Sequence, residues 1–314
     1  MPSDGRFAPS PSSDLHLGNL RTALIAWLAA RHQGARFMLR IDDLDGGRSR
    51  PEIAERQLAD LAALGLDHDG PVPRQSERLG RYRAAFEHLE AAGQVYPCFC
   101  TRAEIREASS APHGRPAGSY PGTCRWLSEP ERAERAASGR VPAWRLRSSL
   151  APELVVDLVQ GTVRVAPEDV VLRRADGGFG YQLAVVLDDA DQGVGEVVRG
   201  ADLLDSVGTQ RELQRALGLP PVDYAHVPLM LGPDGERLAK RHGASTLADA
   251  LAGTSGVKLA GVTPGTPASA AEVRGSLAAS AGLCEPGSVP ELDELVAGFS
   301  YRRLPTESTM MQGC

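Results

Sequence analysis

The sequence predicts an α/β protein in which helices pack on a parallel sheet, and three observations indicate this class. Apolar runs of strand length alternate with helical segments over the first third of the chain. The alternation is interrupted between residues 98 and 174, where cysteines, a Gly- and Pro-rich loop and short β-like runs replace it. It resumes from residue 181 to residue 231. Strands that alternate with helices are typical of a parallel sheet, so we interpret the interruption as an inserted lobe.

The apolar spacing places the elements of the first part. Residues 5–8 are short and apolar enough for a first strand, and a Pro- and Ser-rich loop follows. From Leu20 to His32 apolar residues recur at helical spacing, and Gly34 supplies a stop. The next expected elements are a strand over 36–41, a helix over 51–64 that Pro51 opens, and a helix over 77–92.

The alternation of strands and helices returns after residue 174. We expect a helix that begins at Tyr181, a strand over 196–199, a helix over 210–217 and a strand over 224–231. Beyond residue 244 the composition turns to Ala, Gly, Ser and Pro with weak periodicity, which predicts a short helical tail.

The composition is that of an ordinary globular protein, with 42% hydrophobic and 24% charged residues. A net charge of −6 is not typical of a nucleic-acid-binding domain, although a local basic face would suffice. No apolar run approaches the roughly 20 residues that cross a bilayer, and the N-terminus lacks the features of a signal peptide. We therefore expect a cytoplasmic protein without membrane contact. Of 34 basic residues only Lys240 and Lys258 are lysines, which indicates a chemical reason for keeping them.

The first candidate site lies where the first strand ends and the first long helix begins. Ligands of open α/β sheets collect there, beside helix N-termini that attract anions. Gly18 lets the backbone approach a ligand, and His16 and Asn19 offer donors to phosphate or ribose oxygens. From these residues alone, a simple helix cap is the better explanation.

The second candidate site is the basic run Arg237-Leu238-Ala239-Lys240-Arg241, which follows the last strand. A basic loop can hold the charge that develops at an α-phosphorus, whereas an isolated run of this kind is usually a solvated surface. Two signals aimed at phosphate, at opposite ends of one α/β core, indicate a nucleotide-binding enzyme.

The two sites together carry a family resemblance. Residues 6–19, RFAPSPSSDLHLGN, resemble the first signature of class I aminoacyl-tRNA synthetases, usually written HIGH, and RLAKR resembles the second, usually written KMSKS. The phrases LRTALIAWLAAR, LRIDDLD, YQLAVVLDD and EVVRGADLLDSVGTQ are similar to the glutamyl branch of that class. The resemblance implies a Rossmann-type catalytic domain in two halves, 1–97 and 177–245. It further implies a zinc-bearing, acceptor-binding lobe over 98–176 and a short helical tail over 246–314, without an anticodon-binding domain.

The resemblance also implies roles for matching positions. L-Glutamate would be bound by Arg6, Phe7, Ala8, Pro9, Ser10, Asp42, Tyr181 and Arg199. ATP, with Mg²⁺, would be bound by His16, Gly18, Asn19 and Lys240, of which His16, Asn19 and Lys240 would be catalytic. Arg6 would pair with a carboxylate bidentately, and Asp42 would bind the α-amino group. Without the resemblance, Tyr181 would be taken for a core aromatic, and Arg199 for a surface partner of Asp202.

Three positions depart from the pattern of the family. Asp42 stands where glutamate is usual, Ser13 replaces a glycine, and Ala239 replaces the serine beside the lysine. None of these removes a charge from the mechanism, but each is expected to lower activity.

Three of the five cysteines lie close together in the sequence. Cys98, Cys100 and Cys124 supply three thiolates, and a structural zinc requires four ligands in a tetrahedron. On chemistry alone His113 is the fourth ligand. Shortened members of the glutamyl branch carry CxC…YxxxC, which implies Tyr120 instead and one structural Zn²⁺. The alternative is three buried thiols without metal; a disulfide framework is not expected.

The resemblance to those shortened members also implies which molecule accepts the activated glutamate. Residues 242–314 are too few for a helical domain that reads an anticodon. We therefore expect a monomeric ligase that activates L-glutamate with ATP, independently of tRNA, and transfers it to the queuosine base of tRNA(Asp). The alternatives are charging the 3′ end of tRNA(Glu), or a non-catalytic tRNA-binding paralogue.

Overall fold

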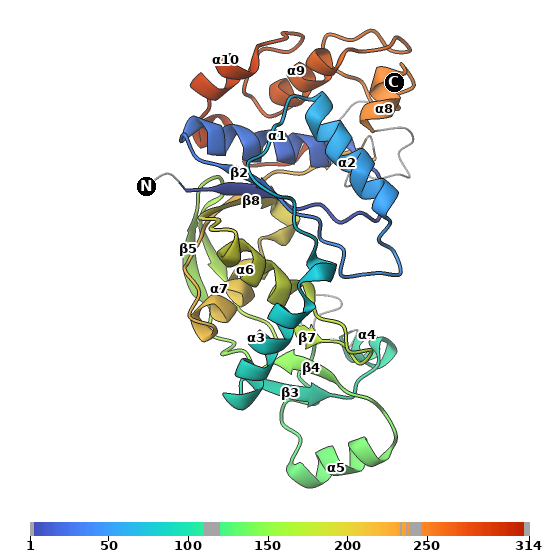
Figure 1. Ribbon diagram of the computed structural model, residues 1–314, viewed down its shortest axis with the longest axis vertical. Helices are drawn as coiled ribbons and strands as arrows, with labels where there is room; N and C mark the ends of the chain where they lie inside the picture. Colours follow the sequence, from blue (N-terminus) through green and yellow to red (C-terminus); the bar gives the residue numbers. More distant parts are fainter. Residues whose placement is uncertain (1–2, 110–119, 233, 237, 239–245, 311–314) are drawn as a thin grey trace.

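The computed structural model describes residues 3–109, 120–232, 234–236, 238 and 246–310. A sheet built from both parts of the chain lies at its centre (Figure 1). β1 (Gly5–Phe7) pairs in parallel with β2 (Phe37–Leu39), and β8 (Glu196–Gly200) pairs in parallel with β9 (Asp223–Val227). The α/β class expected from the alternation is confirmed.

The two strand pairs meet through β1 and β8. A parallel bridge joins Asp4 to Val194, and Arg6 Nη1 donates a hydrogen bond to the carbonyl of Val198 at 3.3 Å. The first strand of the chain, β1, therefore lies beside β8, a strand almost two hundred residues later. The ends of both strands lie at the same end of the sheet.

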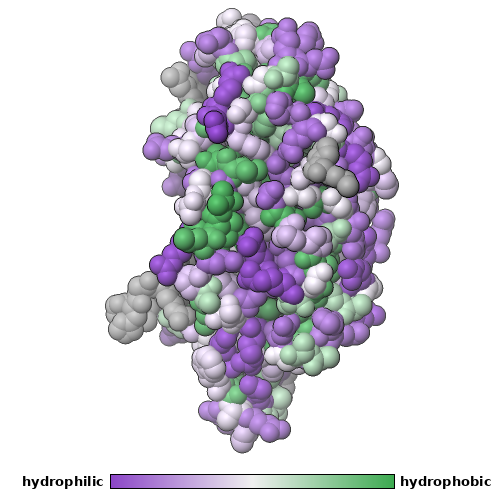
Figure 2. Space-filling model, turned by 90° about the vertical axis from the view of Figure 1, so that its left-hand side faces the viewer, coloured by the Kyte–Doolittle hydropathy of each residue, from purple (hydrophilic) through white to green (hydrophobic). Residues whose placement is uncertain are grey.

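A hairpin that we expected in the inserted lobe extends the main sheet. β5 (Glu153–Asp157) pairs antiparallel with β6 (Gly161–Val165) and in parallel with β9 through Asp157 and Tyr224. These strands lie within the range 98–176 expected for the inserted lobe, yet they extend the main sheet. The sequence of β5, ELVVD, does not alternate between apolar and polar residues, so it indicates neither the buried face nor the neighbouring strand. On the side of the molecule where β5 lies, Figure 2 shows an apolar area among polar residues, and Leu154 and Val156 of this strand are exposed.

Other described residues of that range, together with β3 just before it, form a lobe at the opposite end of the molecule from the C-terminal tail (Figure 1). Its antiparallel sheet has the order β3-β4-β7. The strands are β3 (Val95–Cys98), β4 (Ala143–Leu146) and β7 (Val171–Arg173), and the helices are α4 (Arg102–Ser109) and α5 (Glu129–Ala137).

The helices of the main body lie where they were expected, although α1 begins three residues earlier than predicted and α7 four. They are α1 (Leu17–His32), α2 (Pro51–Ala63), α3 (Leu79–Ala91), α6 (Tyr181–Asp191) and α7 (Ser206–Ala216), with the short turns η1 (Gln75–Glu77) and η2 (Ala201–Leu203). The strand expected over 224–231 ends at Val227 and resumes as β10 (Met230–Leu231). Pro228 lies in the break, where its missing N–H cannot support a ladder.

The tail packs against the main body. It contains α8 (Leu247–Leu251), α9 (Ala270–Ser280), α10 (Leu292–Ala297), η4 (Tyr301–Arg303) and β11 (Thr309–Met310), which pairs in parallel with β10. α9 and α10 cover the side of α1 that faces away from the sheet (Figure 1). α1 is therefore buried around most of its circumference, as an all-round apolar helix requires.

A buried arginine fixes α1 between these layers. The Arg21 guanidinium donates to the carbonyl of Pro228 on one side and to that of Ser280 on the other. Burial lowers the pKa of Arg21 to about 10. Among the described helices, none is both long and apolar enough to cross a membrane.

Candidate active site

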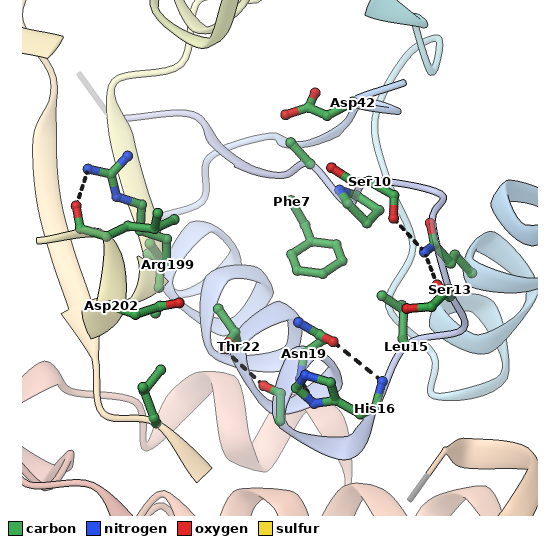
Figure 3. Close-up of a pocket in the computed structure, with 18 of the residues that line it drawn as sticks. Phe7, Ser10, Ser13, Leu15, His16, Asn19, Thr22, Asp42, Arg199 and Asp202 are labelled. Atoms are coloured by element: carbon green, nitrogen blue, oxygen red, sulfur yellow. Dashed lines mark hydrogen bonds between the residues drawn. The ribbon is translucent and has the colours of Figure 1, made fainter. Parts of the chain in front are cut away.

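A cavity of about 550 Å³ opens where β1 and β8 end and α1 begins (Figure 3). Every described residue that the sequence assigned to glutamate or ATP lines it. These residues are Arg6, Phe7, Ala8, Pro9, Ser10, His16, Gly18, Asn19, Asp42, Tyr181 and Arg199. Residues that are far apart in the sequence thus meet at one opening, as expected for ligands at strand ends.

The N-terminus of α1 forms one wall of the cavity. His16 Nδ1 accepts the N–H of Asn19 at 3.2 Å, and Asn19 Oδ1 accepts the N–H of His16 at 3.4 Å. A neutral His16 therefore carries its ring proton on Nε2, so capping the helix is compatible with donation to a phosphate. A Cβ on Gly18 would lie 3.0 Å from the His16 ring, so the glycine makes room for that ring. The positive end of the helix dipole faces the cavity here.

Arg6 projects from β1, and much of its hydrogen-bonding capacity is already used. Its Nε and Nη2 donate to the two carboxylate oxygens of Asp189 at 3.2 and 3.3 Å, and Nη1 donates to Val198 O. A guanidinium has five N–H donors. One N–H on Nη1 and one on Nη2 therefore remain for a ligand carboxylate, and the expected bidentate pairing would have to use this edge.

Behind Arg6 lies a buried cluster of charges that the sequence did not indicate. Arg40 is fully buried and donates from Nε to Asp42 at 2.8 Å and from Nη1 to Asp189 at 2.8 Å. Asp188 lies 3.6 Å from Arg40 Nε and accepts from Arg78 Nε at 2.7 Å. Two consecutive aspartates that follow directly on the apolar run 183–187 of α6 are the signal that could have predicted buried cationic partners.

The cluster sets the protonation of Asp42. Burial raises the pKa of Asp42 to about 6, against the lowering effect of Arg40. Burial alone would also raise the pKa of Asp189, but Arg6 and Arg40 hold it below its usual value. The Asp42 backbone N–H donates to Pro9 O at 3.0 Å, which places this carboxylate beside the segment expected to bind glutamate (Figure 3).

Arg199 and Tyr181 lie on the other side of the cavity. Arg199, near the end of β8, is buried and donates to His226, Gln210 and Leu203. Among the described residues these are its acceptors, so the alternative pairing with Asp202 is not formed. Tyr181 begins α6 with 40% of its surface exposed, so it borders the opening and is not a core aromatic.

The basic run after β10 falls mostly outside the described residues, which include neither Lys240 nor Arg237, Ala239 or Arg241. Leu238, within the run, and Thr246, after it, both contact residues that line the cavity. Leu238 donates its N–H to Met230 O at 2.8 Å, and Thr246 forms a bridge with His16. The role of Lys240 stays a prediction from the sequence.

The cysteine cluster of the lobe is assembled around β3. The sulfurs of Cys98, Cys100 and Cys124 lie within 4.8 Å of one another, with 3.5 Å between those of Cys100 and Cys124. Cys98 Sγ is 3.4 Å from Tyr120 Oη, which also accepts the N–H of Cys124 at 2.8 Å. Zinc–ligand bonds of about 2.0–2.3 Å in a tetrahedron separate the ligands by about 3.5–3.8 Å. The separations of 3.5 Å and 3.4 Å are close to this range, so the donor set suits a zinc ion. His113 lies outside the described residues.

Comparison with known proteins agrees with this geometry. The family model for the catalytic domain of class I tRNA synthetases (E and Q) matches residues 4–258. The chain therefore belongs to the class I tRNA synthetases of this family, which makes it an ATP-dependent ligase.

Within the family the chain groups with the glutamyl-Q tRNA(Asp) synthetases. A protein of that name from Nocardia farcinica is 55% identical, over 96% of this chain and 91% of its own length. Another from Symbiobacterium thermophilum is 49% identical, over 96% of this chain and 94% of its own. Among solved structures, glutamate-tRNA synthetase from Elizabethkingia anophelis superposes with a TM-score of 0.81 at 26% identity, covering 99% of this chain and 68% of that one.

Proposed function

We propose that this chain activates L-glutamate with ATP in the absence of tRNA and transfers the glutamate to the queuosine base of tRNA(Asp). One observation carries the proposal: a single cavity combines Asp42, Arg6 and Arg199, which suit an acidic amino acid, with the capped N-terminus of α1, which suits a phosphate. The names of the relatives support the acceptor, and their lengths match that of this chain.

The residues of the cavity have different roles in the activation of glutamate. Asp42, ionised at neutral pH, binds the α-ammonium group, and Arg6 and Arg199 offer their remaining N–H donors to carboxylate oxygens. An α-carboxylate oxygen of glutamate attacks the α-phosphorus of ATP, and pyrophosphate leaves to give glutamyl-adenylate. The donors of His16 and Asn19 stabilise charge on the phosphate oxygens, so catalysis is by positioning and electrostatics. Mg²⁺ bound with ATP neutralises phosphate charge.

The lobe supplies a second, structural site. Cys98, Cys100, Cys124 and Tyr120 would hold one Zn²⁺, which would fix the segment between β3 and β4 that has few apolar residues of its own. The Arg145 guanidinium lies 3.8 Å from the centre of the Tyr120 ring, and this contact fixes the ring beside the cysteines. Burial raises the pKa of Tyr120, so its hydroxyl would lose the proton only on binding the metal.

ATP–pyrophosphate exchange tests the activation step. We expect exchange that depends on glutamate, without tRNA, and far slower exchange with glutamine or aspartate. Exchange only after tRNA(Glu) is added would favour charging of a 3′ end, an alternative that the likeness to glutamate-tRNA synthetases keeps open. No exchange under any condition would favour a non-catalytic tRNA-binding paralogue.

Labelled glutamate tests the acceptor. The label should pass to tRNA(Asp) that carries queuosine and not to the same tRNA without it. Transfer to tRNA(Glu), or to tRNA(Asp) irrespective of queuosine, would refute the proposed acceptor while leaving activation intact.

A further inference from the structure

The two arginines of the cavity are held in different ways. Arg6 forms a bidentate ion pair with Asp189. Arg199 donates instead to uncharged acceptors: His226 Nε2 at 3.0 Å, Gln210 Oε1 at 2.8 Å and Leu203 O at 3.1 Å. Among the described residues, no carboxylate forms an ion pair with Arg199, although its side chain is buried.

The hydrogen bonds determine the state of His226. Because Arg199 Nε–H can only donate, His226 Nε2 must accept, and a neutral ring then carries its proton on Nδ1. That proton points to Asp157 Oδ2, 2.6 Å from Nδ1. His226 and Asp157 are both buried, and burial lowers the pKa of His226, in opposition to Asp157. The imidazole is therefore a neutral group between a carboxylate and a guanidinium.

The groups around Asp157, His226 and Arg199 hold them in place, and the acceptors bonded directly to Arg199 are uncharged. Asp157 Oδ1 accepts the N–H groups of Val159, Gln160 and His226, so the carboxylate cannot turn away from the ring. On the other side of Arg199, Gln210 Nε2 donates to Gln182. This bond leaves the Gln210 oxygen directed at Arg199. The ring of Tyr224 lies 5.2 Å from the Arg199 guanidinium carbon.

We propose that Asp157 and His226 are positioning residues that orient Arg199 toward the cavity while leaving its positive charge available to a substrate carboxylate. A carboxylate in direct contact would hold the guanidinium equally well but would weaken its attraction for a substrate carboxylate, as Asp189 does for Arg6 even though Arg40 shares Asp189. The interposed neutral imidazole gives the orientation without the neutralisation. This inference rests on the proposed function, because glutamate supplies the carboxylate.

Two kinds of substitution separate orientation from charge. His226→Leu removes the acceptor for Arg199, and we expect the KM for glutamate to rise about 10- to 100-fold, as when one hydrogen bond to a charged group is lost. His226→Gln offers a neutral acceptor again and should recover most of this loss. Gln210→Glu keeps a hydrogen bond to Arg199 but neutralises its charge, so it should raise the KM for glutamate and reduce the preference for glutamate over glutamine. The KM for ATP should change little in all three.

Nitrogen-15 NMR gives a readout independent of activity. The chain has seven histidines, and the signal that is present in the wild-type spectrum but missing in that of His226→Gln belongs to His226. This signal should be that of a neutral Nδ1–H tautomer. A protonated ring or an Nε2–H tautomer at neutral pH would overturn the inference even if His226→Leu fails to fold. The inference would also be overturned if His226→Leu and Gln210→Glu fold and their KM for glutamate is unchanged. Failure of the wild-type chain to catalyse glutamate-dependent exchange would instead refute the proposed function.

Discussion

Asp189 is the carboxylate that two buried arginines share, and its replacement by asparagine gives a quantitative test of the cluster. Asp189 binds Arg6 through two oxygens and Arg40 at 2.8 Å, and its side chain is only 7% exposed. Asp189→Asn keeps the shape but leaves a buried positive charge without its partner. Breaking a buried ion pair on one side typically costs about 3–5 kcal/mol.

The same helix supplies a matched control. Asp191 pairs with Arg78 and Arg81, and its side chain is 31% exposed, so Asp191→Asn should cost about 1 kcal/mol or less. With about 2.1 cal/mol/K of unfolding entropy per residue, these costs correspond to losses in Tm of about 5–8 °C for Asp189→Asn and under about 2 °C for Asp191→Asn.

Scanning calorimetry at neutral pH measures both variants under identical conditions. The reasoning is refuted if the two proteins melt within about 1 °C of each other, because the buried pair would then contribute no more than the exposed one.

Two further predictions concern the zinc site and Asp42. Elemental analysis should find about one zinc per chain, lost in Cys124→Ser but kept in Cys284→Ser, whose half-buried thiol lies outside the cluster; a folded, metal-free wild-type protein would contradict the ligand set. Because the pKa of Asp42 is raised to about 6, its carboxylate becomes protonated as the pH falls through that value, and the KM for glutamate should rise there. Asp42→Asn should have a high KM at every pH and lack this transition, so an identical pH profile in wild type and variant would exclude Asp42 as its origin.

Local signals in the sequence were sufficient for most elements, whereas the residues that line the cavity were predicted from the family resemblance. The spacing of His16 and Asn19 is that of a helix cap, and the structure shows this cap directly. The partners behind the cavity could not be predicted in this way. Arg40 meets Asp189 across 149 residues of chain, and a sequence does not tell which of 40 acidic residues a given arginine will contact.

The hairpin of β5 and β6 illustrates the same limit. Its apolar runs indicate two short strands, but the choice of β9 as neighbour depends on how distant parts of the chain meet. Asp157 lies at the end of this hairpin, so its connection with Arg199 through His226 was hidden as well. The tail was also hard to place. The apolar circumference of α1 predicts that a second layer covers this helix, but not that α9 and α10 form the layer.

The enclosure of α1 has a thermodynamic consequence for ligand affinity. His16 caps this helix and Asn19 lies in its first turn, and the helix is already immobilised between the sheet and α9 and α10. The conformational entropy of ordering these donors is therefore lost when the protein folds and not when a nucleotide binds. Each phosphate contact then contributes its full free energy to binding, because no entropy is lost at that stage by ordering the helix. In this way α9 and α10 strengthen binding at a cavity to whose lining they contribute no residue.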